Sequence, residues 1–80
     1  MATVEARLLA ALIEDVTARG FRRMIAVIGD HTNTVSIHLH EAAGFAPGGV
    51  YPAIAYKHGR WLTSVHLQRT LGPGDTTAPV

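Results

Sequence analysis

Three side chains that can form hydrogen bonds or transfer protons occur at helical spacing in the middle of the chain: Asn33, Ser36 and His40. On an α-helix, which turns by about 100° per residue, the three point within about 60° of one another. A carboxamide, a hydroxyl and an imidazole would then line one edge near a helix N-terminus, where free N–H groups and the helix dipole favour acceptors. The pattern predicts a wall for an anionic ligand that carries amide groups.

Each of these residues also has an ordinary structural explanation. Asn33 can simply cap a helix, Ser36 can be a first-turn helix residue, and His40 can be a surface or boundary histidine. A metal site is not expected, because His38 lies about 200° from His40 on a helix and the pair cannot bind one ion.

The segment around these residues fits two secondary structures. Val35, Ile37 and Leu39 alternate with polar residues, which is the period of a strand and would place a serine and two histidines on one face. A helix is favoured because the run continues through Glu41-Ala42-Ala43, which are good helix formers, and stops at Gly44.

The preceding segments predict a helix and a strand that would position this site. Thr3 can cap an amphipathic helix that ends near Gly20, because apolar residues recur at helical spacing: Val4, Leu8, Leu9, Leu12, Ile13 and Val16. Phe21 to Ile28 predicts a strand that is apolar enough to be covered on both faces, as parallel strands usually are. Residues 46–49 are expected to form a loop.

A β-hairpin is predicted after this loop. Val50–Lys57 and Arg60–Arg69 would form its strands around the two-residue turn His58-Gly59. That register predicts two cross-strand pairs, Tyr56 with Trp61 and Ile54 with Thr63, and we interpret the aromatic pair as a core or dimer contact. Because Pro52 cannot donate a ladder hydrogen bond, its strand should lie at the sheet edge.

Composition restricts the classes of function. The 80 residues include no cysteine and are 48% hydrophobic, which is typical of one small domain that forms a core. A formal net charge of +1 with scattered basic residues argues against nucleic-acid binding. The sequence has neither a signal-peptide pattern nor a stretch of roughly 20 apolar residues that could span a membrane, so a cytoplasmic location is expected. Residues 72–80, rich in proline and glycine, are expected to form a disordered tail.

The order and spacing of three motifs resemble a known family. The strand ends in Ala26-Val27-Ile28-Gly29-Asp30, the helix contains Leu39-His40-Glu41, and the hairpin turn contains Lys57-His58-Gly59-Arg60-Trp61. From about Leu8 to Leu71 the sequence is similar to the GNAT superfamily of acetyl-CoA-dependent N-acetyltransferases, in its phosphinothricin-acetyltransferase branch. The resemblance covers the C-terminal half of such a domain, which would occupy residues 1–71.

The resemblance implies a fold, an activity and roles for the three side chains. The fold would be a partial GNAT-like α/β fold, helix-strand-helix followed by a β-hairpin, with a mixed three-stranded sheet whose last strand inserts between the other two. The activity would be acetyl transfer from acetyl-CoA to the primary amine of an amino-acid-like acceptor such as phosphinothricin or a methionine derivative. In the family the residue matching Asn33 hydrogen-bonds the cofactor, and the residue matching His40, tyrosine in many relatives, protonates the departing thiolate. We therefore expect Asn33 and Ser36 to bind acetyl-CoA and His40 to be catalytic.

The same resemblance implies that part of the active site is missing. The family's pyrophosphate loop, R/Q-x-x-G-x-G/A, would have its glycines at Thr3 and Glu5, where side chains narrow the approach to phosphate and a carboxylate repels it. We expect the isolated chain to be inactive and to act with a complementing N-terminal half or as a homo-oligomer. Two other hypotheses remain: a non-catalytic remnant that self-associates, and a small metal-binding protein that uses its histidines.

Overall fold

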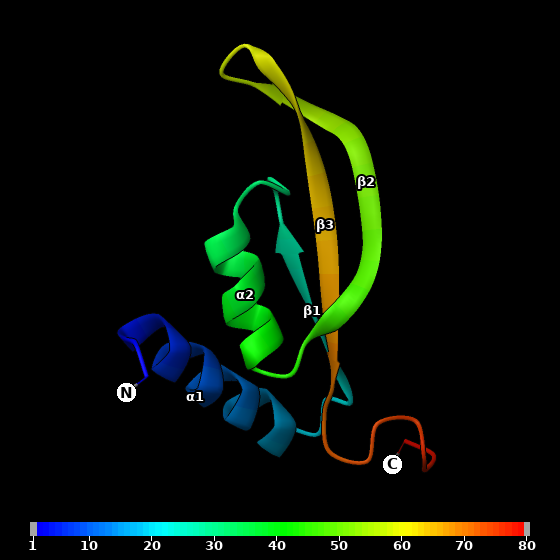
Figure 1. Ribbon diagram of the computed structural model, residues 1–80. Coiled ribbons are helices and arrows are strands. Elements are labelled where there is room, and N and C mark those ends of the chain that lie inside the picture. Colours follow the sequence, from blue (N-terminus) through cyan, green and yellow to red (C-terminus); the bar gives the residue numbers. More distant parts are fainter. Residues whose placement is uncertain (1, 80) are drawn as a thin grey trace.

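A computed structural model describes residues 2–79. Met1, the first residue of the predicted domain at 1–71, and Val80, the last residue of the predicted tail at 72–80, therefore lie outside the described residues. The elements follow in the order helix α1 (Val4–Ala18), strand β1 (Arg23–Ile28), helix α2 (Thr34–Ala42), strand β2 (Ala46–Lys57) and strand β3 (Arg60–Thr70) (Figure 1). The predicted α/β order of helix, strand, helix and hairpin is confirmed. The loop predicted at residues 46–49 is wrong, because Ala46 and Pro47 already pair with β3.

The three strands form one sheet in the order β1–β3–β2, so the last strand inserts between the other two as expected. Both pairs are antiparallel, which corrects the expected mixed sheet. The reason is that β1 and β2 run in the same direction but are separated by β3, so no parallel pair forms among the described residues. Pro52 lies in the outer strand β2, as its missing N–H predicted.

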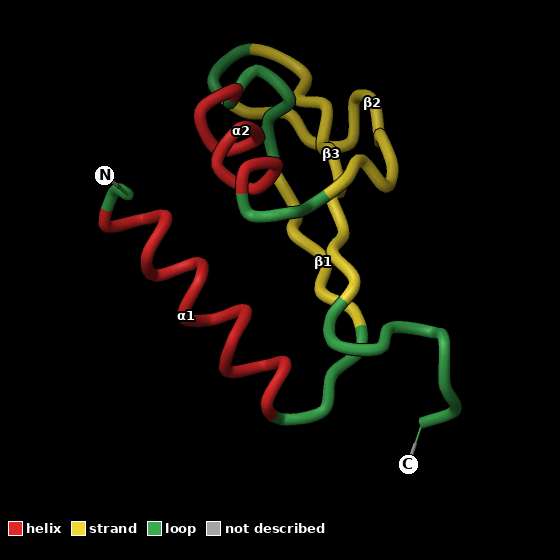
Figure 2. Tube along the Cα trace, turned by 60° about the horizontal axis from the view of Figure 1, so that its bottom comes forward, coloured by secondary structure: helices red, strands yellow, loops and turns green. Residues whose placement is uncertain are grey.

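Both helices lie on the same side of the strands (Figure 2). The core beneath them consists of five buried residues, one from α1, one from β1 and three from the segments that follow: Ile13, Ile28, Phe45, Leu67 and Leu71. The opposite face of β1 is open, with Ile25 and Val27 each 61% exposed. The prediction that β1 is covered on both faces is therefore wrong; an antiparallel sheet can leave one face solvated.

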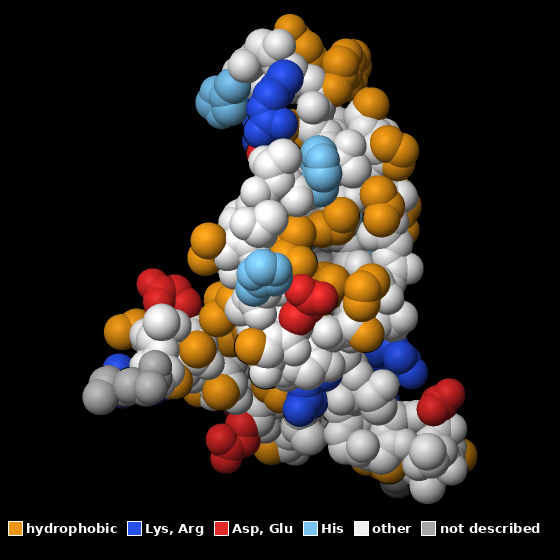
Figure 3. All heavy atoms as spheres, in the orientation of Figure 1, with side chains coloured by type: hydrophobic (Ala, Val, Ile, Leu, Met, Phe, Trp, Pro, Cys, Tyr) orange, Lys and Arg blue, Asp and Glu red, His pale blue; other side chains and the backbone are white. Residues whose placement is uncertain are grey.

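Helix α1 buries only part of its predicted apolar stripe. Ile13 is in the core, and Leu9 and Val16 pack against it. The other three members of the stripe are largely exposed: Val4, Leu8 and Leu12. Figure 3 shows hydrophobic side chains at the surface of this helix and along the hairpin. The described chain thus leaves an unusual amount of apolar surface without a covering layer.

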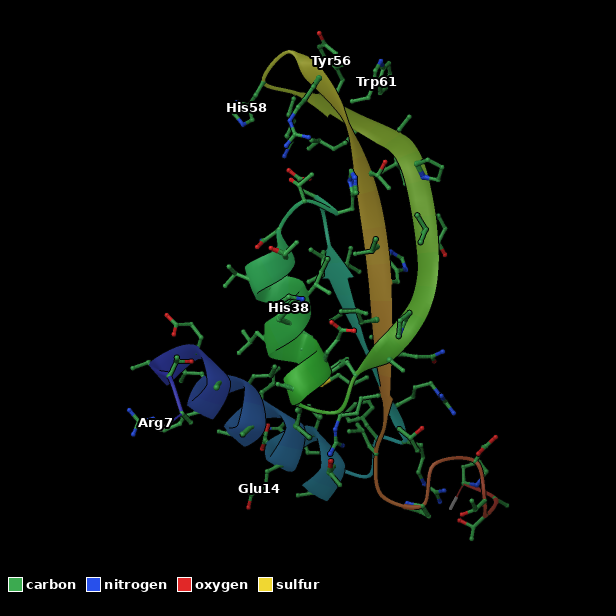
Figure 4. The ribbon with its side chains drawn as sticks, in the orientation of Figure 1. Arg7, Glu14, His38, Tyr56, His58 and Trp61 are labelled. Atoms are coloured by element: carbon green, nitrogen blue, oxygen red, sulfur yellow. The ribbon has the colours of Figure 1, made fainter. Side chains whose placement is uncertain are left out.

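The β2–β3 hairpin extends beyond the end of β1 (Figure 1). Its turn is the predicted one, because His58 and Gly59 both have positive φ angles, 53° and 76°, as a type I′ turn requires. The predicted pair Tyr56–Trp61 is confirmed, with an edge-to-face contact at 5.3 Å between ring centroids near the tip (Figure 4). Both rings are more than half exposed, so they are not part of the core.

The second predicted pair of the hairpin, Ile54 with Thr63, is wrong. The register shifts between Tyr51 and Ala55, where β2 carries extra residues relative to β3. Ala53 adopts a positive φ of 51° within this irregularity. A bulge of this kind adds backbone that alternation of side chains alone does not reveal.

The segment after β3 folds back toward the start of β1. The guanidinium of Arg22 donates hydrogen bonds to the carbonyl oxygens of Gly74, Thr77 and Ala78 and to the hydroxyl of Thr77. Disorder of residues 72–80 in solution stays a prediction, and these four contacts identify Arg22 as the residue that holds the segment when it is ordered.

Candidate functional site

The candidate site begins at the turn that leads from β1 into α2. Asp30 Oδ1 accepts hydrogen bonds from the backbone N–H of Thr32 at 3.0 Å and from its hydroxyl at 2.8 Å. The carbonyl of Asp30 accepts from the N–H of Asn33 at 3.0 Å. Such a turn arises because the aspartate side chain can bond its own backbone two residues further on. Asp30 thereby fixes the point at which helix α2 starts.

Asn33, Ser36 and His40 are joined through the backbone of Ser36. The N–H of Ser36 donates to Asn33 Oδ1 at 3.2 Å, so Asn33 is the N-cap of α2. The carbonyl of Ser36 bonds His40 Nδ1 at 2.7 Å. The structure thus brings the three residues to one side of the helix, as their spacing predicted, while their functional roles stay proposals.

The cap uses the side-chain oxygen of Asn33 and leaves its amide nitrogen available to a ligand. Its side-chain oxygen is engaged by Ser36. Its amide nitrogen makes no hydrogen bond to any other residue between positions 2 and 79, and the residue is exposed. Asn33 can therefore donate to an acceptor such as an amide carbonyl, while its ordinary role as a helix cap is kept.

The contact with Ser36 determines the protonation pattern of His40. A carbonyl oxygen can only accept, so Nδ1 must carry a hydrogen. In the neutral ring Nε2 is then an acceptor, and only the imidazolium can donate a proton from Nε2. The ring is half-buried and packs edge-on against Phe45, with centroids 5.2 Å apart. His38, by contrast, is an exposed residue of the same helix (Figure 4).

The sequence reasoning missed a link between this turn and the hairpin tip. Arg60 Nη2 forms an ion pair with Asp30 Oδ2. Close by, the N–H of His31 donates to the carbonyl of Thr63 at 2.8 Å. No local pattern predicts the ion pair, because Asp30 and Arg60 are 30 residues apart in sequence. The sequence patterns place Arg60 beside the hairpin turn, where it could meet an anion, but they do not predict its ion pair with Asp30.

The turn holds the carboxyl of Asp30 in its ionised form. The backbone N–H of Thr32 is the main cause that lowers its pKa from 3.8 to about 2, followed by the Thr32 hydroxyl and opposed by partial burial, while Arg60 lowers it further. Because the pKa is lower in the folded state, ionised Asp30 stabilises the fold above pH 3.8 and loses that effect as the pH falls through about 2. Asp30 is thus ionised at neutral pH and available to pair with the guanidinium of Arg60.

The N-terminal end of α1 is less suited to bind a phosphate. Thr3 is the N-cap of this helix, and its hydroxyl accepts from the N–H of Ala6 at 3.1 Å. That bond uses a donor that a glycine-rich loop would offer to a ligand, and the carboxylate of Glu5 stands in the first turn. Helix α2 is capped in the same way by Asn33, so the carboxylate of Glu5 is the feature that makes the α1 end less favourable for an anion.

Between residues 2 and 79, no group of three or more His, Asp or Glu side chains is arranged to hold a metal ion. No helix in the same part of the chain is long and apolar enough to cross a membrane.

Comparison with known proteins gives a consistent set of relatives. No family sequence profile matches the chain. A phosphinothricin N-acetyltransferase from Alcaligenes faecalis is 44% identical over 72 residues, which are 90% of this chain and 36% of that protein. An L-methionine sulfoximine/L-methionine sulfone acetyltransferase from Pseudomonas paraeruginosa is 42% identical over 67 residues, 84% of this chain and 38% of that protein.

A solved structure matches the fold as well as the sequence. The crystal structure of a GNAT-superfamily phosphinothricin acetyltransferase from Sinorhizobium meliloti, in complex with acetyl-CoA, superposes with a TM-score of 0.89 at 48% identity, over 94% of this chain and 40% of that one. The chain therefore spans less than half the length of the relatives that it matches.

Proposed function

We propose that this chain, a homologue of part of the GNAT-superfamily phosphinothricin acetyltransferases, supplies through residues 1–71 the C-terminal half of an acetyl-CoA-dependent N-acetyltransferase domain. The observation that carries the proposal is the superposition of 94% of the chain on an acetyl-CoA-bound relative with a TM-score of 0.89. Relatives named for phosphinothricin and for methionine sulfoximine support a primary amine on an amino-acid-like molecule as the acceptor.

In this proposal the N-terminal end of α2 forms one wall of the acetyl-CoA site. The free amide nitrogen of Asn33 donates to a carbonyl of the cofactor's pantetheine arm, and Ser36 lies beside it. When the neutral acceptor amine attacks the acetyl carbon, a C–N bond forms, the C–S bond breaks, the sulfur leaves as a thiolate, and the nitrogen releases one proton to water. His40, as the imidazolium, gives its Nε2 proton to that sulfur, while its Nδ1–H stays bonded to the Ser36 carbonyl.

Strand β1 lies at one edge of the described sheet, and this free edge supports the need for a partner. The N–H of Leu71 donates to the carbonyl of Arg22, so alternate residues of β1 bond β3, and the N–H and C=O groups of the residues between them point to the free edge. The outer strand β2, by contrast, carries two prolines and two register shifts, which discourage pairing. We propose that β1 pairs with a strand of a complementing N-terminal half or, failing that, of a second copy.

A second candidate function has its own supporting observation. Thr3 and Glu5 occupy the start of α1, where the resemblance places glycines that approach pyrophosphate. This departure favours a non-catalytic remnant that self-associates through the same open surface.

The proposal of an acetyltransferase half includes a cytoplasmic location, because acetyl-CoA is a polyanion that does not cross a bilayer unaided.

The test is a fused domain. The upstream part of the Alcaligenes faecalis phosphinothricin N-acetyltransferase, up to the position that matches Glu5, is joined to this chain from Ala6 onward. We expect this fusion to acetylate phosphinothricin with acetyl-CoA, and we expect the isolated chain not to do so. A fusion that folds cooperatively but transfers no acetyl group would reject the acetyltransferase proposal in favour of the remnant.

A further inference from the structure

We infer that Asp30 and Arg60 are positioning residues: their ion pair fixes the hairpin tip against the turn that caps α2 and so determines where Asn33 stands. The use of this device for cofactor binding rests on the function proposed above. The device itself is a property of the isolated chain and can be measured there.

The ion pair lies beyond the end of the β1–β3 pairing, where the sheet no longer connects the turn after β1 to the hairpin. The register between β1 and β3 ends at Ile28 and Val65, and the hairpin continues beyond that point. Past it, the turn is attached to β3 by the N–H of His31, which donates to the Thr63 carbonyl at 2.8 Å, and to the hairpin turn by the Asp30–Arg60 ion pair. Two attachments from different residues of the hairpin restrict both translation and rotation of the turn.

The carboxylate of Asp30 transmits this restraint to the helix cap. Oδ2 contacts Arg60, whereas Oδ1 accepts from the N–H and the hydroxyl of Thr32. The carbonyl of the same residue accepts from the N–H of Asn33, whose side chain in turn caps the helix at Ser36. A chain of hydrogen bonds thus runs from the hairpin tip to the side chain proposed to bind the cofactor.

Because its side chains are partly exposed, the ion pair can position the turn without contributing much to the overall stability of the fold. The side chain of Arg60 is 50% exposed and that of Asp30 29% exposed, so water and salt weaken the pair, and exposed pairs contribute little to the free energy of folding. Loss of Arg60 should therefore loosen the turn without unfolding the core. Lys57 offers a matched control, because it stands opposite Arg60 in the hairpin register and shares no ion pair with Asp30 in the described part of the chain.

The experiment is amide hydrogen exchange, followed by NMR, on the isolated chain. In Arg60→Ala the N–H groups of His31, Asn33 and Ser36 should exchange roughly two- to fivefold faster, the range expected for loss of one exposed ion pair. The N–H of Leu71, bonded to Arg22 near the opposite end of β1, should keep its rate. Arg60→Lys should restore part of the protection, and Lys57→Ala should change none of these rates.

Three results would overturn the positioning role: unchanged exchange in Arg60→Ala, equal acceleration of the Leu71 amide, or the same effect from Lys57→Ala. Kinetics of the fused domain then test whether the ion pair supports binding of acetyl-CoA. Arg60→Ala should raise the KM for acetyl-CoA several-fold while kcat stays within twofold, since Asn33 would bind and not react. If exchange changes as expected but KM does not, the pair positions the turn and the cofactor role of Asn33 is wrong.

Discussion

Replacement of His40 by alanine is expected to lower kcat of the fused domain by about 10²–10⁴-fold, the usual contribution of a general acid. The imidazole is held by the Ser36 carbonyl through Nδ1 and by an edge-to-face contact with Phe45, so Nε2 is presented in one direction. Without it, the thiolate must leave unprotonated or take its proton from water. The KM for acetyl-CoA should change little, because the proposed contact with the cofactor comes from Asn33.

His38 is the internal control for this prediction. It is an exposed residue of the same helix, two positions from His40 and about 200° around the helix axis. His38→Ala should leave kcat within twofold of the parent fusion. The role assigned to His40 is wrong if the two alanine variants lose activity equally, or if His40→Ala retains full activity.

Replacement of Leu71 by alanine should destabilise the chain by about 2–5 kcal/mol, the range for removal of a buried leucine side chain. Leu71 has a relative exposure of 0% and packs in a cluster of five buried residues between positions 2 and 79. Total stabilities of natural domains are about 5–15 kcal/mol, and a chain this small lies near the low end. We therefore expect the variant to be largely unfolded at 25 °C or slightly above.

The measurement for Leu71 is urea or thermal unfolding followed by circular dichroism. Val35→Ala serves as the control, because Val35 is 80% exposed and its loss should shift stability by less than about 0.5 kcal/mol. An unfolding midpoint for Leu71→Ala that equals that of the parent would contradict the assignment of Leu71 to the core.

Features that depend on neighbours in sequence were the predictable ones. The cap at Asn33 follows from a bond to a residue three positions away, and the turn at His58-Gly59 follows from two adjacent residues. The end of α2 before Gly44, which has a φ of 95°, is likewise local. In each of these elements, the residues that determine the local structure lie within a few positions of one another in the sequence.

Features that depend on distant partners were not predictable from the same patterns. The apolar run of β1 suggested burial on both faces, but its second face is open among the described residues, and only the choice of sheet neighbours reveals this. The bulge in β2 changes which residues pair without changing the alternation of side chains. The Asp30–Arg60 ion pair joins residues that are 30 positions apart in sequence, so no local pattern predicted the contact.

The proposed function claims that this chain carries one wall of an acetyl-CoA site and that an N-terminal half supplies the other. Calorimetric titration with acetyl-CoA is the decisive measurement, made on the isolated chain and on the fused domain. The fusion should bind with a micromolar Kd, about −8 kcal/mol, and the isolated chain should show no binding at concentrations up to roughly a hundred times higher. Micromolar binding by the isolated chain would contradict the claim, because Thr3, Glu5 and the described wall at α2 would then suffice.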